Sequence, residues 1–262
     1  MKPSLRGIQN IYREVAHTYE RVNHVLTFGF DMAWRRRAAR LGAQNQPERC
    51  LDVCSGTGEM AAEMAAQMAA QMAAQGTAQM AATAVPASRP RPRQVVATDV
   101  SADMLALAKT GREKLGLRFA RADASRLPFP DETFDVVTIS FATRNLHRDR
   151  ESLANCFGEF RRVLRPGGLF VNLETSQPRN RLWRALFHVY IRLAVRPIGH
   201  LLSGSRSGYA YLAYTIPRFY DERELSGLLG ECGFGTVAAE TLLGGIAAIH
   251  VARKSAPDRA NT

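Results

Sequence analysis

Leu51-Asp52-Val53-Cys54-Ser55-Gly56-Thr57-Gly58-Glu59 is the stretch of sequence that decides the fold. It begins as a buried strand, passes into a glycine turn and continues as a helix-forming run from Glu59. Ligands bind in the crevice at the carboxyl end of such a strand, because backbone N–H groups point into it and glycine lets a ligand approach closely. A Gly-x-Gly turn alone is weak evidence, since many such turns bind nothing.

A second apolar strand, Val95 to Thr98, ends at Asp99, and a helix from Ala102 to Thr110 follows it. An acidic side chain at the end of this strand can accept hydrogen bonds from both hydroxyls of a ribose. The alternative is that Asp99 only caps the helix, but Ser101 can provide the cap by itself. We therefore expect Asp99 to be free for a ligand.

Strand and helix patterns continue to alternate along the chain. Three further strands are predicted at residues 117–120, 134–141 and 168–173. The β-branched residues of 134–141 are typical of a parallel strand that is buried on both faces. Asp123 and Ala124, a polar residue beside a small one, follow the strand at 117–120 and can hold an adenine edge. Together these patterns predict a doubly wound α/β sheet.

Several motifs are more specific than this alternation. They are Arg144-Asn145 after the strand at 134–141, Tyr209-Ala210-Tyr211-Leu212, and a tail from Gly244 to His250, supported by Val15 to Asn23 and Trp34-Arg35-Arg36. Leu127-Pro128-Phe129-Pro130 and Arg165-Pro166-Gly167-Gly168 are less specific, because they recur across many methyltransferases. With these motifs the chain resembles, nearly end to end, the menaquinone/ubiquinone biosynthesis C-methyltransferase family of class I S-adenosylmethionine-dependent methyltransferases.

The resemblance implies a Rossmann-like, doubly wound, seven-stranded methyltransferase fold, with N-terminal helices and a helical insertion before the last two strands. We expect a single domain over 1–262, with a helical cap at 1–46 and a substrate-side helical insertion at 178–220. Cys54 and Ser55 depart from the small residues usual in the family, often Ala or Gly, but both are small enough to leave the backbone accessible.

The resemblance also implies S-adenosylmethionine as methyl donor and a polyprenylated quinol as substrate. The expected donor-binding residues are Gly56, Thr57, Gly58, Asp99, Asp123, Ala124 and Ser140. For catalysis we expect Arg144 to stabilise a quinolate, His147 to accept a proton and Tyr19 to line the substrate side. His17, His24 and Tyr211 are further candidates for that side, while His250 is either part of the site or a buried histidine of the last strand.

The largest departure from the family lies at residues 60–94, between the first two strands. Met-Ala-Ala-Gln/Glu units repeat every four residues from Met60 to Gln75, and Val85 to Arg93 is rich in Pro and Arg. Ala, Met, Gln and Glu are strong helix formers, so a long helix with an apolar methionine stripe is predicted. The Pro/Arg stretch predicts an extended loop. We interpret the segment as a low-complexity insertion in which the methionines serve packing.

Composition limits the location of the protein. The chain has 262 residues, 46% of them hydrophobic, and a formal net charge of +11. This basic charge suits either nucleic acid or an anionic membrane surface. The four cysteines form no CxxC pair and no metal-ligand set with nearby histidines, which predicts reduced thiols, no metal site and a cytoplasmic enzyme. Residues 1–12 carry no apolar signal core, and no uncharged run is long enough to span a bilayer.

The segment from Arg181 to Pro197 is predicted to contact a membrane or to pack on the sheet. Basic residues recur there every three or four positions, at Arg181, Arg184, His188, Arg192 and Arg196. Aromatic and aliphatic residues fill the remaining positions, as in a helix that lies in a membrane interface. A helix packed on the sheet with solvated arginines is the alternative. Contact with the inner face of the membrane would bring the enzyme to a lipid-tailed substrate. The sequence is compatible with a homo-oligomer but does not predict one.

Three functions follow from these patterns. The first is C-methylation of a quinol, either demethylmenaquinol to menaquinol or 2-methoxy-6-polyprenyl-1,4-benzoquinol in ubiquinone biosynthesis. The second is methylation of nucleic acid, but Ser140-Phe141-Ala142-Thr143 stands where enzymes that methylate base amino groups often carry Asn/Asp-Pro-Pro-Tyr/Phe, so no nucleic-acid partner is expected. The third is a non-catalytic scaffold that binds S-adenosylmethionine, which the glycine turn and Asp99 do not distinguish from an enzyme.

Overall fold

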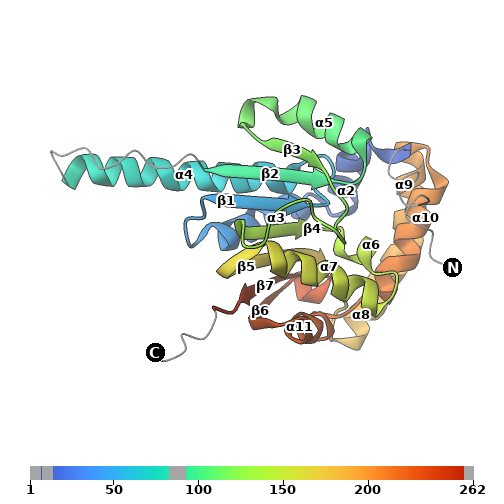
Figure 1. Ribbon diagram of the computed structural model, residues 1–262. Helices are drawn as coiled ribbons and strands as arrows, with labels where there is room; N and C mark the ends of the chain where they lie inside the picture. Colours follow the sequence, from blue (N-terminus) through green and yellow to red (C-terminus); the bar gives the residue numbers. More distant parts are fainter. Residues whose placement is uncertain (1–6, 8–13, 83–92, 257–262) are drawn as a thin grey trace.

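A seven-stranded sheet runs through the computed structural model, which describes residue 7, residues 14–82 and residues 93–256 (Figure 1). The strands are β1 (Arg49–Val53), β2 (Gln94–Asp99), β3 (Arg118–Arg121), β4 (Phe134–Ser140), β5 (Leu164–Thr175), β6 (Phe234–Leu242) and β7 (Ala247–Lys254). Their order across the sheet is β3-β2-β1-β4-β5-β7-β6, and β7 pairs antiparallel with both of its neighbours. The predicted seven-stranded, doubly wound fold is confirmed.

The order of the strands reverses between β1 and β4. The chain moves outward from β1 through β2 to β3, and β4 then pairs with β1 on its other side. In open α/β sheets, ligands bind at the carboxyl ends of the strands where the order reverses. The end of β1, which is the start of the glycine turn, lies at this point.

Helices cover both faces of the sheet. Trp34 and Ala38 of α3 (Phe30–Ala43) pack on one face with Met60 and Met64 of α4 (Glu59–Ala82). The other face is covered by α7 (Arg150–Val163) and α11 (Glu222–Glu231), where Phe157 is among the largest fully buried side chains. Because both faces are buried, β1 and β4 need apolar residues on both sides rather than strict alternation.

The repeated segment forms part of this packing. Met60, Met64 and Met68 are at most 2% exposed, so the first turns of α4 belong to the core, as the helical spacing of the methionines predicts. The rest of the helix runs past the amino-terminal ends of the strands and extends well beyond the sheet (Figure 1). Most of the predicted Pro/Arg loop, residues 83–92, lies outside the described residues, as do residues 1–6 and 8–13 of the predicted cap.

A layer of helices lies at the carboxyl edge of the sheet (Figure 1). It contains α2 (Tyr19–Leu26), α8 (Arg181–Tyr190), a π-helical turn (Ile191–Val195), α9 (Arg196–Ser203) and α10 (Arg206–Thr215). Val22, Phe187, Ile191 and Tyr209 are buried together in its own small core. The amino-terminal segment and the insertion after β5 therefore pack on each other.

The remaining elements include α5 (Ala102–Arg112), which packs beside β2 and β3, and several short helical turns. These turns are η1 (Glu113–Leu115), α6 (Thr143–Leu146), η3 (Ile216–Arg218) and η4 (Leu243–Gly245). Across residues 14–82 and 93–256, no helix combines the length and apolar composition needed to cross a bilayer.

Candidate active site

Two adjoining cavities lie at the carboxyl edge of the sheet. The first, called here the loop cavity, is lined by residues 54–57 of the glycine turn, by Asp99 and by Ser140. The second, called here the apolar cavity, has a volume of about 310 Å³ and lies between the helical layer and the sheet. Tyr19 and Phe141 line both cavities, so the two spaces meet at these side chains.

The glycine turn bends sharply after β1. The backbone φ angles of Cys54, Gly56 and Gly58 are 53°, 55° and 85°, in the region that favours glycine. A Cβ on Gly58 would lie 3.3 Å from Ala108 on α5, which leaves no space for a larger residue. Gly56 and Thr57 line the loop cavity, whereas Gly58 allows close packing of the turn on α5.

Asp99 holds the glycine turn in place. Its Oδ2 accepts a hydrogen bond from the backbone N–H of Gly56 at 2.9 Å, and its Oδ1 accepts one from the backbone N–H of Ser101 at 2.8 Å. Ser101 caps α5 as predicted, but Asp99 is not free as we expected, because it also organises the loop. Burial raises the pKa of its carboxyl. A carboxylate has roughly four acceptor positions, so both oxygens retain capacity for ligand hydroxyls.

The polar groups of the loop cavity fit a nucleoside ligand. The Ser55 hydroxyl is buried without a hydrogen-bond partner in the described part of the chain, and it lies on the cavity wall. Buried polar groups are seldom left unpaired, so a polar ligand is the natural partner. Ser140, at the end of β4, accepts a hydrogen bond of 3.4 Å from Nε of Arg35. Gly56, Thr57, Asp99 and Ser140 thus converge as the sequence predicts.

Three predicted site residues lie elsewhere. Asp123 is exposed and accepts hydrogen bonds from the backbone N–H and the hydroxyl of Ser125, while Ala124 is buried in the core. His147 packs its ring against Tyr220, with ring centroids 4.8 Å apart. None of the three is among the residues that line the two cavities. Asp123 instead lines a separate, open hollow that shares Asn145 with the loop cavity.

Arg144 lies on the wall of the apolar cavity and is 5% exposed. Its guanidinium donates to Glu174 and Thr175 of β5, at 3.2 and 3.1 Å, and to Thr215 of α10 at 3.1 Å. The Glu174 carboxylate also accepts from the Arg144 backbone N–H at 3.0 Å. A guanidinium held this firmly offers a fixed positive charge beside the cavity.

Tyr19 reaches the junction of the cavities from α2. Burial raises the pKa of its phenol, opposed by a hydrogen bond from Asn23 and by the positive charges of Arg35 and Arg144. The phenol is therefore un-ionised near neutral pH and can donate a hydrogen bond into either cavity.

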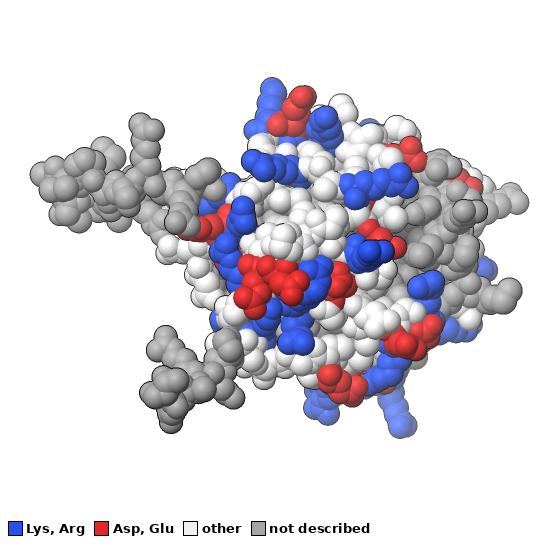
Figure 2. Space-filling model, viewed as in Figure 1, with Lys and Arg blue, Asp and Glu red and all other residues white. Residues whose placement is uncertain are grey.

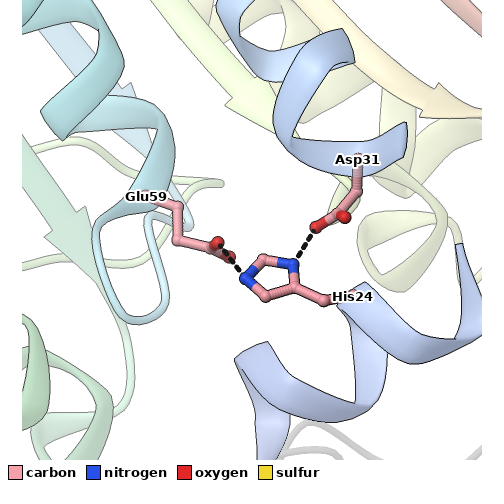
Figure 3. Close-up of side chains that lie close together, drawn as sticks. All are labelled: His24, Asp31 and Glu59. Carbon is pink, nitrogen blue, oxygen red and sulfur yellow. Dashed lines mark hydrogen bonds and ion pairs between the residues drawn. The ribbon is translucent and has the colours of Figure 1, made fainter. Parts of the chain in front are cut away.

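A charged network beside this junction was not predicted from the sequence (Figure 3). The Asp31 carboxylate is 2.8 Å from Nδ1 of His24 and 2.5 Å from a guanidinium nitrogen of Arg35. Glu59 lies 3.5 Å from Nε2 of His24 and 3.0 Å from Arg35. Asp31 lines the apolar cavity, and Arg35 and Glu59 line the loop cavity.

The sequence contains one signal for this network. Asp31 and Arg35 stand four residues apart on a helix, which is the spacing of an ion pair, but joining them to Glu59 requires the tertiary structure. His24, Asp31 and Glu59 have the ligand types of a cation site, with atoms within 4.8 Å of one another. Arg35 pairs with both carboxylates and offsets one of their two negative charges, so each carboxylate has a cationic partner without an added ion.

The mouth of the apolar cavity is bordered by exposed apolar side chains. Phe28, Trp183, Leu186 and Leu243 line the cavity and are also exposed, Phe28 by 77%. Leu182 and Leu193, on α8 and the π-helical turn, are exposed nearby along the same helical face. We call these six residues the apolar patch. Exposed apolar surface of this kind marks contact with a membrane, a ligand or another protein.

Comparison with known proteins identifies relatives that match nearly the full length of this chain. The profile described as the ubiE/COQ5 methyltransferase family matches residues 2–254. The chain is 36% identical over 243 residues to the demethylmenaquinone methyltransferase of Thermus thermophilus, covering 92% of this chain and 98% of that relative. It is 32% identical over 250 residues to the ubiquinone/menaquinone biosynthesis C-methyltransferase UbiE of Stutzerimonas stutzeri, covering 93% and 87%.

Solved structures agree with the fold. The crystal structure of a SAM-dependent methyltransferase from Thermotoga maritima matches with a TM-score of 0.57, and the match covers 94% of this chain and 99% of that one. At 14% sequence identity, this similarity concerns the fold alone.

Proposed function

The chain belongs to the ubiE/COQ5 methyltransferase family, and we propose that it transfers a methyl group from S-adenosylmethionine to a ring carbon of a polyprenylated quinol. The observation that carries the proposal is the meeting of two unlike cavities at Tyr19 and Phe141. A cavity built on a glycine turn, with the polar groups of Ser55, Asp99 and Ser140 in its wall, suits the nucleoside, and the more apolar cavity suits the ring and prenyl tail.

The donor-binding residues in this proposal are Gly56, Thr57, Asp99 and Ser140, which line the loop cavity. Bound S-adenosylmethionine supplies an electrophilic methyl group on a positively charged sulfur. Asp123 and Ala124 stay in the proposal on the family resemblance alone, because they line neither cavity. Gly58 contributes through the shape of the turn rather than through the cavity wall.

The residues of the apolar cavity have a different task. They must hold the ring carbon in line with the methyl group, within near-attack distance, and exclude water. Arg144 carries a fixed charge that stabilises negative charge developing on a quinol oxygen. Tyr19, at the junction, orients the ring by donating a hydrogen bond. His147 is a weaker candidate for the proton acceptor, since its ring packs on Tyr220 instead of lining a cavity.

Demethylmenaquinol is the proposed substrate, with menaquinol as product. The support is the name of the Thermus relative, at 36% identity, compared with 32% for the relative named for both quinones. The methoxy-polyprenyl benzoquinol of ubiquinone biosynthesis is the second candidate, because the Stutzerimonas relative carries both names.

A membrane-peripheral, cytoplasmic location is part of the proposal. The apolar patch surrounds the mouth of the cavity that would take the prenyl tail, and Arg181, Arg192 and Arg196 lie on the same helical segment. This combination suits the interface of an anionic bilayer. Basic and acidic side chains are interspersed on the face shown in Figure 2, so that face gives no support to a nucleic-acid groove.

The test is a methyl-transfer assay with labelled S-adenosylmethionine under anaerobic, reducing conditions. Demethylmenaquinol, the methoxy-polyprenyl benzoquinol and RNA are offered separately. We expect label in menaquinol. Label only in the benzoquinol would reassign the pathway, and label only in RNA would reject a quinol substrate. Calorimetric binding of S-adenosylhomocysteine without transfer to any acceptor would support a scaffold instead.

A further inference from the structure

The methylation of a quinol carbon releases one proton, and the described residues offer one carboxylate on the wall of the substrate cavity. Asp31 is the sole acidic residue among those lining the apolar cavity. The other ionisable groups on that wall are Tyr19, Tyr190 and Arg144. Burial raises the pKa of both phenols, and arginine does not lose its proton in proteins. Among the ionisable groups on this wall, the Asp31 carboxylate is therefore the one that can accept the proton.

The hydrogen bonds of Asp31 leave one acceptor position of its carboxylate unused. Its Oδ1 accepts from the Thr27 hydroxyl at 2.7 Å, and its Oδ2 takes His24 at 2.8 Å and Arg35 at 2.5 Å. These are three donors for the roughly four acceptor positions of a carboxylate. The side chain is about 1% exposed, so bulk water does not compete for the position that remains.

His24 connects Asp31 with solvent. Its side chain is 29% exposed, while its Nδ1 lies 2.8 Å from Asp31 and its Nε2 lies 3.5 Å from Glu59 (Figure 3). An imidazolium formed at this place would lie between two carboxylates. The network therefore has a buried end at the cavity and an end from which a proton can leave.

From this geometry we infer that Asp31 accepts the hydroxyl proton of the quinol during methyl transfer and that His24 relays it to solvent. The inference rests on the proposed function. The ring carbon beside the hydroxyl forms a bond to the methyl carbon, and the electron pair of the broken C–S bond stays on sulfur. The O–H electron pair becomes the second bond of a ring carbonyl, and the proton passes to Asp31.

The remaining steps restore the aromatic ring. Loss of the hydrogen from the methylated carbon returns its electron pair to the ring, and the carbonyl oxygen takes up a proton. Overall, one proton leaves per methyl group transferred. Asp31 is a weak base, but this suffices, because a hydroxyl becomes strongly acidic as its ring accepts a cationic carbon. Arg35 pairs with the carboxylates on both sides without taking the fourth acceptor position of Asp31.

The groups that face this relay come from several elements. Thr27 and His24 approach Asp31 from the end of α2 and the turn after it, Arg35 from α3 and Glu59 from α4. Tyr19 and Arg144 line the same cavity. Burial alone would raise the pKa of the Asp31 carboxyl, but the Thr27 hydrogen bond and the charge of Arg35 outweigh it and lower the pKa, so Asp31 is a carboxylate near neutral pH.

The main test substitutes Asp31→Asn in the full-length protein and measures single-turnover methylation against pH. We expect turnover at pH 7 to fall by about 100-fold, within the range for a lost general base, while S-adenosylhomocysteine binding stays within about twofold. The variant should recover as pH approaches the pKa of the quinol hydroxyl, taken as roughly 10, as for tyrosine, because ionised substrate no longer needs a base. A fluorinated, more acidic quinol should likewise show a smaller deficit.

A purely structural role for Asp31 would give the same deficit at every pH and with both quinols, and would overturn the inference. Unchanged turnover would also overturn it. Glu63→Gln is the matched control, since Glu63 lies one turn beyond Glu59, pairs with Arg36 at 3.8 Å and lines neither cavity. Its turnover should equal that of the parent.

A second variant keeps the inference testable if Asp31→Asn fails to fold. His24→Ala leaves the pair of Asp31 and Arg35 in place, and we expect about tenfold slower turnover at pH 7 that added imidazole restores. No deficit, or a deficit that imidazole does not change, removes His24 from the relay. A parent protein that methylates no quinol would reject the proposed function itself, whereas an active parent with unaffected variants rejects this inference alone.

Discussion

The backbone N–H of Gly56 donates a hydrogen bond to Oδ2 of Asp99 over 2.9 Å. The turn after β1 is therefore held directly by the acid that ends β2, although 42 residues separate Gly56 from Asp99 in the sequence. The acid that is proposed to bind the ribose also fixes the loop that carries Thr57.

Asp99→Ala should weaken donor binding severely. The substitution removes the proposed acceptor for ribose hydroxyls and the acceptor for two backbone N–H groups. With about 1.5–3 kcal/mol for each hydrogen bond to a charged group, we expect at least a 100-fold increase in the dissociation constant of S-adenosylhomocysteine by calorimetry. Asp103→Ala, on the exposed first turn of α5, removes the same charge nearby and should have little effect. Equal affinities in the two variants would contradict a role for Asp99.

Arg144→Ala should lower turnover while leaving donor binding intact. Arg144 lines only the apolar cavity, so its loss should act on the quinol, by about 100-fold if it stabilises developing negative charge. Because Glu174 would lose a buried partner, we also expect a loss of stability of about 3–5 kcal/mol. Melting temperature and turnover are measured together, and the exposed Arg148→Ala is the control. Turnover equal to that of the control would exclude Arg144 from the mechanism.

Leu193→Asp should weaken association with anionic vesicles. Leu193 is 67% exposed in the apolar patch and lines neither cavity. If it inserts into the interface, replacing it should weaken partitioning about tenfold, given about 1.5–3 kcal/mol for a fully buried leucine. Sedimentation with vesicles measures the bound fraction. Leu115→Asp, which changes an exposed leucine outside the patch, should bind like the parent, and methylation of a short-tailed soluble quinol should be unchanged in both. Equal sedimentation of the two variants would disprove docking through the patch.

Gly199→Ala should destabilise the helical layer. A Cβ at Gly199 on α9 would lie 2.0 Å from the ring of Tyr209, which is buried against it. Overpacking of this kind costs about 1–3 kcal/mol or more. Gly227→Ala on α11 is a matched change with no atom within 4 Å of the new carbon, and it should stabilise by about 0.5–1 kcal/mol. Urea denaturation compares the two, and shifts of the same sign would refute the packing argument.

Titration of the buried Asp52 carboxyl should make the stability of the folded protein depend on pH. Burial raises its pKa from 3.8 to about 7, so the folded protein keeps a proton that the unfolded chain loses near pH 4. Stability should therefore fall as pH rises from about 4 to about 7 and not change further because of this group. The contribution is on the order of 4 kcal/mol over that range. Asp52→Asn should flatten this part of the profile in urea denaturation; parallel profiles would show that Asp52 does not titrate there.

The sheet could be predicted from the sequence because its strands are buried on both faces. Residues 134–141 differ from β4 only in the last position, where Phe141 has a φ of 54° and leaves the strand. The strand predicted at 168–173 extends to Leu164–Thr175, since pairing with β4 and β7 stabilises backbone that lacks a strong local pattern. Local sequence therefore identified the strands, and neighbouring strands set their limits.

The donor side of the site was predictable where residues end a strand or follow it closely, whereas Tyr19 and Arg144 were predicted from the family resemblance and line the apolar cavity. Thr57, Asp99 and Ser140 line the loop cavity because the carboxyl ends of parallel strands share one edge of the sheet. Asp123 lies one strand further out, and its carboxylate is used by Ser125. His147 lies close to Arg144 in sequence, but the short helix α6 turns its ring toward Tyr220. The network of His24, Asp31, Arg35 and Glu59 joins three helices, so no local pattern beyond the spacing of Asp31 and Arg35 could have identified it.

Helix α4 starts beside the loop cavity and runs the opposite way to the neighbouring strands, so its far end points away from the chemistry (Figure 1). One further four-residue unit would lengthen it by about 6 Å at the end most distant from both substrates. Gain or loss of such four-residue units therefore changes the length of the chain at the end of α4 that lies away from both cavities. The same protruding tip is a suitable place for a fluorophore or an affinity handle.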